Sequence, residues 1–297
     1  MDNRTDTREF LSSRRARITP EQAGLLAYGG KRRVPGLRRE EVAILAGMSV
    51  DYYTRLERGN LAGASDSVLD ALARALQLDD AETAHLFDLA RAASAPASTR
   101  RRPSQPQQLR PIVQRILDAM PGTPAWVRNG RMDFLAANTL GHALHSEIFA
   151  DPMRPANNAR FVFLDPRSQA FYPDWERSAN DIVAILRSEA GRNPYDRKLT
   201  DLIGELSTRS ETFRTRWAAH NVRFHRTGLK RIHHPVVGDL ELAYEAMEFP
   251  AEPGLQMFVC IAEPGSASED ALKLLASWAA TLETAQRPET SRATDGI

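Results

Sequence analysis

The side chains with the clearest chemistry are arginines gathered near the N-terminus. The segment 8–39 carries nine arginine and lysine residues against two acids, although the whole chain has a net charge of only +1. A guanidinium group pairs with phosphate oxygens through two parallel hydrogen bonds, so this cluster favours a nucleic-acid partner. Only four of the 39 basic residues are lysines. A genome whose base composition favours arginine codons would produce the same bias, and both explanations stay open.

The segment 38–59 has the spacing of two short helices joined by a tight turn. Residues 38–46 and 50–58 predict the helices, Gly47 predicts the turn, and Ser49 is a favourable N-cap for the second helix. A small glycine turn between two helices at this spacing is typical of a helix-turn-helix.

The second of these helices has an inner and an outer face. Tyr53 and Leu56 lie three residues apart and pack back on the first helix. The outer face near its N-terminal end consists of Val50, Asp51, Thr54 and Arg55. Arg55 can bond guanine O6 and N7, and Thr54 can contact a thymine methyl group. Asp51 either accepts a hydrogen bond from cytosine or only stabilises its own helix N-terminus.

The turn glycine, the serine cap and the closing Leu-Glu-Arg-Gly at 56–59 resemble the lambda-repressor-like (Xre-type) helix-turn-helix, over about 80 residues. That resemblance implies a second helix lying in the major groove of duplex DNA. A helical bundle without a DNA partner is the alternative. The residues expected to contact DNA are Arg14, Arg15, Lys31, Arg32, Arg33, Arg38, Arg39, Ser49, Val50, Asp51, Tyr52, Thr54, Arg55 and Arg58, with Arg17 as a further phosphate candidate. Each basic residue could instead belong to a solvated surface. We expect Glu57 to be a salt-bridge partner.

A change of composition divides the chain of 297 residues into two domains. Residues 94–111 contain four prolines and no apolar periodicity, which is typical of an extended linker. We expect a helix-turn-helix domain at 6–93, a linker at 94–107, a second domain at 108–282 and a flexible tail at 283–297. The first domain is predicted to be all-α with five helices, over 8–17, 38–46, 50–58, from 65 or 66 to 76, and from 79 or 80 onward.

The second domain is predicted to be α+β, with an antiparallel sheet. Strands are expected at 125–127, 132–135, 222–226, 230–237, 239–249 and 255–261. Helices are expected at 112–119, from 139 to about 144, and at 174–189, 196–206, 210–219 and 268–282. Asn129-Gly130 is a strong hairpin signal between the first two strands, and Asn138 is placed to cap the helix that follows.

This opening hairpin and capped helix resemble a PAS-like domain, in which an antiparallel sheet and helices enclose a ligand cavity. Asp174-Trp175, Asn193-Pro194 and the patterns at 213–222 and 230–245 are similar to the ligand-binding domain of MmyB-type regulators. Members of that family join an Xre-type helix-turn-helix to a PAS-like module. The resemblance implies a bacterial one-component transcription factor with a small apolar, fatty-acid-like ligand and no other cofactor.

An apolar pocket would be lined by aromatic and aliphatic side chains of the helices and the sheet. The candidates are Trp126, Phe134, Phe161, Phe163, Trp175, Ile182, Leu186, Trp217, His220, Tyr244 and Phe258. Each could instead simply pack the core. A carboxylate head group would need a cation or a donor, for which Arg187, Arg214, His220 and His234 are available.

The sequence offers little for catalysis. It has no G-x-S-x-G, Walker or G-x-G-x-x-G motif, and His233 and His234 are adjacent in a predicted strand, so they point to opposite faces. His142 and His145 could share a helix face, but we predict no metal site and no enzymatic activity. A hydrolase or metal-dependent enzyme tethered to DNA is the alternative, and an antitoxin with a protein partner is a third hypothesis.

One cysteine, Cys260, excludes an internal disulfide, and we expect it to be a buried, inert thiol. No apolar run is long enough to span a membrane and no signal peptide precedes the first helix, so we expect a cytoplasmic protein. The partners expected are a palindromic duplex operator, a small-molecule effector and a second copy of the chain, with pairing through the second domain.

Overall fold

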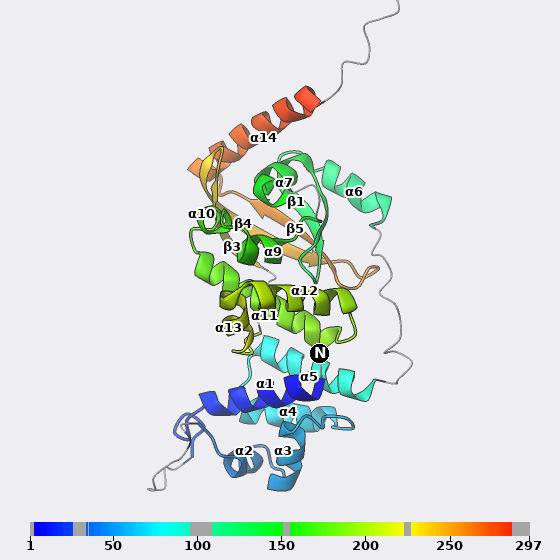
Figure 1. Cartoon of the computed structure of the whole chain (residues 1–297), viewed down its shortest axis with the longest axis vertical. Helices are drawn as coiled ribbons and strands as arrows, with labels where there is room; N and C mark the ends of the chain where they lie inside the picture. Colours follow the sequence, from blue (N-terminus) through cyan, green and yellow to red (C-terminus); the bar gives the residue numbers. More distant parts are fainter. Residues whose placement is uncertain are drawn as a thin grey trace, which may run out of the picture. The chain divides into compact units, whose positions relative to one another are not determined.

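The computed structural model describes residues 3–25, 34, 36–95, 109–150, 155–222 and 227–286 (Figure 1). The chain divides into two compact units, and neither unit is a continuous stretch of sequence. The first, Met1–Pro106 with Ala179–Phe224, is here named the helical unit. The second, Gln107–Ser178 with His225–Ile297, is named the sheet unit. The domains expected at 6–93 and 108–282 are continuous in sequence, whereas residues 179–224 group with the N-terminal helices.

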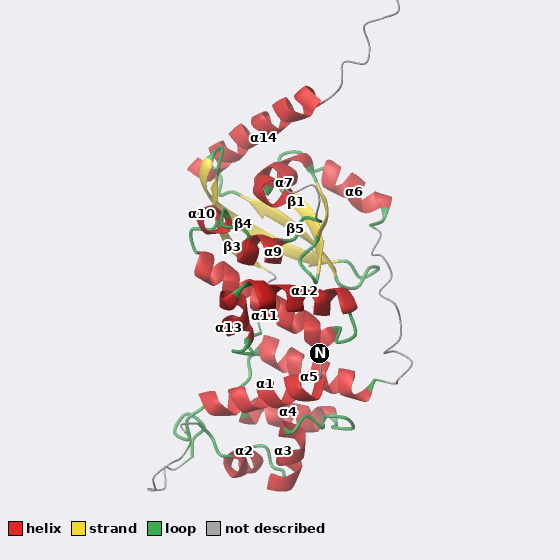
Figure 2. Ribbon diagram, in the orientation of Figure 1, coloured by secondary structure: helices red, strands yellow, loops and turns green. Residues whose placement is uncertain are grey.

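The helical unit contains only helices among its described elements (Figure 2). They are α1 (Asn3–Arg17), α2 (Arg39–Leu45), α3 (Val50–Glu57), α4 (Asp66–Ala75), α5 (Asp80–Ser94), α11 (Trp175–Arg192), α12 (Arg197–Arg209) and α13 (Glu211–Trp217). The first turn of α11, before Ala179, belongs to the sheet unit. The five N-terminal helices confirm the all-α prediction. α1 begins five residues earlier than predicted because Thr7 is buried beside Phe10 and Leu11, which extends the inward face by one turn.

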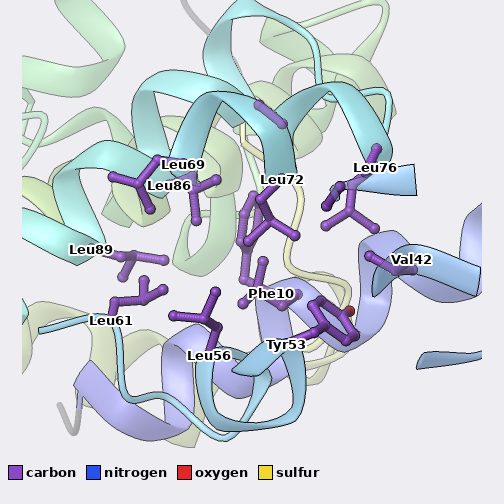
Figure 3. Close-up of a cluster of buried hydrophobic side chains, with 14 of the residues drawn as sticks. Phe10, Val42, Tyr53, Leu56, Leu61, Leu69, Leu72, Leu76, Leu86 and Leu89 are labelled. Atoms are coloured by element: carbon purple, nitrogen blue, oxygen red, sulfur yellow. The ribbon is translucent and has the colours of Figure 1, made fainter. Parts of the chain in front are cut away.

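Leucines of α3, α4 and α5 and their connections dominate the core of the helical unit, where they surround Phe10 of α1 (Figure 3). Val42 of α2 and Tyr53 of α3 close one side of it. The same cluster includes Val222, which follows α13 in sequence. The N-terminal helices therefore share a hydrophobic core with a residue far along the chain.

The sheet unit is built on five antiparallel strands in the order β2-β1-β5-β4-β3. The strands are β1 (Ala125–Asn129), β2 (Phe134–Ala137), β3 (Thr227–His234), β4 (Gly238–Glu248) and β5 (Leu255–Ile261). The helices of this unit are α6 (Pro111–Asp118), α7 (Thr139–Leu144), α8 (Ser146–Phe149), α9 (Asn158–Leu164), α10 (Ser168–Phe171) and α14 (Ala267–Gln286). The predicted α+β class is confirmed.

The two faces of the sheet have different partners. Val113 and Leu117 of α6 pack against Val127 and Met257 on one face. The opposite face carries Trp126, which contacts the helical segment that follows β2. An amphipathic helix before the first strand thus covers one face and leaves the other to α7 and the residues after it.

Several elements differ from the sequence prediction. Three short helices, α8, α9 and α10, were not expected, because segments of four to seven residues are too short to show a helical period. The strand expected at 222–226 is not found at Val222, and residues 223–226 lie outside the described part of the chain. Most of the expected linker and tail also lies outside it, although residues 283–286 are helical.

The first hairpin does not use a two-residue Asn-Gly turn. β2 begins only at Phe134, and Met132 has a φ of +69°. The Asn129 side chain organises the longer loop instead, because its Oδ1 accepts hydrogen bonds from the backbone N–H groups of Arg131 and Asp133 at 3.0 and 3.1 Å.

Candidate functional site

The α2–turn–α3 segment forms as the sequence predicts. Gly47 adopts a φ of +64° after α2, which favours glycine, and the Ser49 side chain accepts a hydrogen bond from the N–H of Tyr52 at 3.1 Å. Tyr53 and Leu56 are fully buried against α2 and the core. These local contacts fix the orientation of α3 and leave its opposite side uncovered.

The uncovered side of α3 is the candidate nucleic-acid interface. Val50, Asp51 and Arg55 are exposed, while Tyr52 and Thr54 are half-buried beside them. The Arg55 guanidinium carbon lies 5.0 Å from the centroid of the Tyr52 ring, so the aromatic ring supports the arginine at the surface. A cation held in this way on an otherwise open helix face can reach base edges or phosphates.

Glu57 is a salt-bridge partner, as predicted. Its carboxylate is buried, accepts a hydrogen bond from Arg15 Nε at 2.6 Å, and is also bonded by Arg39 Nε and the Tyr53 hydroxyl. Arg15 donates a further bond to the carbonyl of Leu37 and is largely covered. Arg15 therefore secures α1 to the segment before α2, whereas Arg39 remains half-exposed.

The expectation that Arg14 contacts phosphate is contradicted. Its side chain is 2% exposed, its Nε lies 2.8 Å from a carboxylate oxygen of Glu82, and its guanidinium lies over the Phe10 ring. Arg17 reaches the same Glu82 from the surface, at 3.2 Å. Arg38 and Arg58 are exposed, and the predicted phosphate contacts Lys31, Arg32 and Arg33 lie outside the described residues.

Helices α11 and α13 complete the helical unit by contacting α1 and α5. A Cβ atom at Gly191 of α11 would lie 2.6 Å from the ring of His85 in α5, so the two helices approach closely there. Nearby, Arg192 pairs with Asp88 at 3.5 Å. Arg187 is buried and lies 3.9 Å from Asp6 of α1.

His220, which follows α13, joins three elements through both ring nitrogens. Its Nδ1 accepts a hydrogen bond from Arg187 Nη1 at 2.8 Å, so Nε2 carries the proton and donates to Glu9 at 2.8 Å. Arg14 also donates to the backbone carbonyl of His220. Burial, together with the charges of Arg187 and Arg14, lowers the pKa of His220 to about 3.

We expect His220 to make the stability of the chain pH-dependent. Its pKa is lower in the folded chain than the ordinary value of about 6.5, so its contribution is complete above pH 6.5 and is lost as pH falls below it. The loss is about 1.4 kcal/mol per pH unit, or about 2 kcal/mol between pH 6.5 and 5. Urea unfolding of His220→Gln should show a flatter pH dependence than wild type. Parallel curves for the two proteins would contradict this assignment.

The aromatic residues predicted to line a ligand pocket fall into two groups. Trp126, Phe134, Tyr244 and Phe258 are in the sheet unit, with the Trp126 ring stacked on Phe258 at 5.5 Å and on Phe134 at 6.1 Å. Tyr244 lies beside Phe258 at 6.3 Å. These four side chains come from β1, β2, β4 and β5 and form one aromatic cluster on the face of the sheet opposite α6.

The second group lies in the helical unit. Ile182 and Leu186 are buried in α11, and the Trp217 ring lies 4.0 Å from the Arg187 guanidinium carbon. His220 has both ring nitrogens engaged, which leaves neither for a ligand. The structure therefore does not bring the predicted lining residues together within one unit.

Three other predicted lining residues belong to the sheet unit but have partners of their own. The Trp175 indole N–H donates to the carbonyl of Val162 and to Ser168, both at 3.2 Å, and its ring contacts Phe163. Phe161 packs against Phe171. Phe161 is buried in the core, whereas Trp175 and Phe163 are half-buried.

The remaining head-group candidates also have partners. His234 is buried with Nε2 2.9 Å from the carbonyl of Ala143, while His233 is exposed, as predicted for opposite faces. Arg214 is on the surface, 3.8 Å from Glu211. Arg128, a buried cation two residues after Trp126, was not among the predicted site residues. The period of two in a strand places both residues on the same face and was the signal that could have identified it.

Metal and redox chemistry find no support among the described residues. No group of three or more histidine, cysteine, aspartate or glutamate side chains there could hold a metal ion. His145 is buried 4.4 Å from Trp126, whereas His142 is exposed and contacts Phe149, so the pair does not converge. Cys260 is buried, as predicted, and burial raises the pKa of its thiol to about 11.

None of the helices in the described part of the chain combines the length and the apolar character that crossing a membrane requires.

Comparison with protein families covers both parts of the chain. A model of the MmyB-like transcription regulator ligand binding domain matches residues 109–275, and a model of a helix-turn-helix domain matches residues 11–86. No curated protein matches the chain significantly. The first match spans more than half of the chain and includes all five strands, and the second includes α2, the turn and α3. The chain therefore belongs to the MmyB-like transcription regulators and combines their ligand-binding domain with an N-terminal, DNA-binding helix-turn-helix.

Proposed function

We propose that this regulator binds a specific duplex operator through the outer face of α3, as an Xre-type homodimer, and responds to a fatty-acid-like effector bound by the sheet unit. The observation that supports operator reading best is Arg55, exposed on α3 and supported by Tyr52. Val50 and Thr54 lie beside it and provide apolar contact for a thymine methyl group. Arg38 and Arg58 are exposed in the same segment and suit phosphates.

We expect Arg55→Ala to weaken specific DNA binding by about 1–3 kcal/mol and to relax the preference at one base position. A duplex selected from a random pool by the wild-type chain serves as the operator, with a scrambled duplex for comparison. Arg115 is exposed on α6 in the other unit, so Arg115→Ala is the control and should bind as wild type does. Equal losses on selected and scrambled DNA would make Arg55 a phosphate contact instead.

The homodimer is proposed from the two-fold symmetry that palindromic half-sites require and from an apolar row on the sheet. Leu229, Ala243 and Ile261 are cross-strand neighbours on β3, β4 and β5, on the face opposite Trp126. Leu229 is 45% and Ile261 59% exposed. Burying this row against a second copy would remove apolar surface from water. Sedimentation of the operator complex should give two chains per duplex.

The aromatic cluster around Trp126 supports an apolar effector, and binding of dodecanoate to the wild-type chain tests that proposal.

The route to DNA is proposed to run through α11 and α13. The ligand-binding family match includes these helices, yet they contact α1 through Arg187 and His220. α1 in turn contacts the turn after α3, where Arg4 donates to the Asn60 side chain. An effector that favours one arrangement of α11 would thereby alter the support of α3.

A further inference from the structure

Arg128 is a buried cation on the aromatic face of the sheet. It lies in β1, two residues after Trp126, and is 4% exposed. Its guanidinium carbon lies 4.1 Å from the centroid of the Phe258 ring, on the neighbouring strand β5. The side chain therefore extends over the sheet surface rather than into solvent.

No described carboxylate compensates this charge. Arg128 forms no ion pair with an acidic side chain in the described ranges, and its Nη2 is buried without a hydrogen-bond partner. The groups that interact with it electrostatically are the phenols of Tyr244 and Tyr172. Burial lowers the pKa of Arg128 to about 10, which still leaves it protonated at neutral pH.

Arg128 differs from two other deeply buried arginines, Arg14 and Arg187, which each lie near a carboxylate. Arg14 lies against Glu82 at 2.8 Å, and Arg187 lies 3.9 Å from Asp6. Each has a carboxylate, as buried charges usually require. A buried guanidinium with aromatic neighbours and no carboxylate is costly for the folded chain unless an anion from outside completes it.

We propose that Arg128 anchors the anionic head group of the effector, so that the ligand is a carboxylate with an apolar body lying along Trp126 and Phe258. This inference rests on the proposed effector-binding function of the sheet unit and specifies its head-group residue. Guanidinium and carboxylate match as a bidentate pair, which would satisfy the open Nη2.

A second cation of the same face adds to the positive potential. Lys230 Nζ lies 5.4 Å from the Trp126 ring centroid and 5.5 Å from that of Tyr244. Lys230 pairs in register with Leu242, on the face of the sheet that carries Tyr244. Both cations thus lie against the rings that would contact the ligand body, and a neutral lipid would leave Arg128 uncompensated.

The test compares dodecanoate with 1-dodecanol, which has the same chain length and no charge. We expect the full-length, delipidated wild-type chain to bind dodecanoate at least about tenfold more tightly, by isothermal titration calorimetry. Arg128→Met should remove this difference, so that dodecanoate binds no more tightly than dodecanol. Arg115→Met, on the exposed surface of α6, is the matched control and should retain the wild-type preference.

The melting temperature of the ligand-free chain is the second readout. If Arg128 has no structural partner in the ligand-free chain, Arg128→Met removes an uncompensated buried charge. The melting temperature should then stay unchanged or rise. A lower melting temperature would mean that Arg128 has a structural partner, and would overturn the proposal. Equal wild-type binding of both probes would also overturn it and leave the apolar effector intact. If wild type binds neither probe, the fatty-acid effector and the head-group role of Arg128 both fail.

Discussion

Gly59→Ala is expected to destabilise the helical unit by about 2–5 kcal/mol, through left-handed strain and overpacking together. Gly59 ends the segment after α3 with a φ of +90°. A Cβ atom there would lie 2.4 Å from the carbonyl oxygen of Arg4 and 2.7 Å from its Cα. These are backbone atoms of α1, which cannot rotate away as a side chain could, so either α1 or the end of α3 must move.

Gly47→Ala is the matched control. Gly47 also has a positive φ, of +64°, but a Cβ atom there would meet no atom within 4 Å. Gly47→Ala should therefore lower the free energy of unfolding only by the cost of the backbone strain, about 1–2 kcal/mol. Urea unfolding followed by far-ultraviolet circular dichroism compares the two variants. Equal losses would show that α1 does not restrict the turn after α3.

Arg187→Met is expected to lower the free energy of unfolding of the helical unit by about 3–5 kcal/mol, the usual cost of removing one partner of a buried charged network. Arg187 donates to His220 Nδ1 at 2.8 Å and to the carbonyl of Trp217, and its guanidinium lies over the Trp217 ring. It also pairs with Asp6 of α1. Methionine fills similar volume but replaces none of these polar contacts.

Arg214→Met provides the comparison for this variant. Arg214 lies in α13, in the same helical unit as Arg187, but it is on the surface and pairs only loosely with exposed Glu211. Its replacement should change the unfolding free energy by less than about 1 kcal/mol. Thermal unfolding of both variants measures the difference. If Arg187→Met unfolded at the wild-type temperature, the contact of α11 with α1 would be energetically minor.

Local signals made the helix-turn-helix predictable from sequence. Ser49 caps α3 and Gly47 has the positive φ that its position required, because both depend on neighbouring residues alone. The same applies to Asn138, whose side chain caps α7 by accepting from the N–H of Gly141 at 2.7 Å. Strand β4 was clear for a similar reason, since one buried and one exposed side chain alternate along most of it.

Long-range contacts were not predictable in this way. Arg14 could not be distinguished from Arg15 by composition, although its spacing from Phe10 and Leu11 places it on the inward face of α1. Residues 179–224 group with the N-terminal helices partly through charge pairs such as Arg187 with Asp6. The two members of such a pair are far apart in sequence and leave no periodic signal. The burial of Arg128 was not predicted because arginine is rarely buried without a charged partner.

The contribution of Val222 to the hydrophobic core of the helical unit has a consequence for how the protein is made. During translation α1 to α5 leave the ribosome well before α11 and α13. At roughly 5–20 residues per second, several seconds separate the emergence of α5 from that of Val222. Until Val222 and His220 have been synthesised, the nascent N-terminal helices lack part of their hydrophobic core, and Arg14 lacks one of its hydrogen-bond partners. A chain that ended before Val222 would present α3 without the complete hydrophobic core of the helical unit.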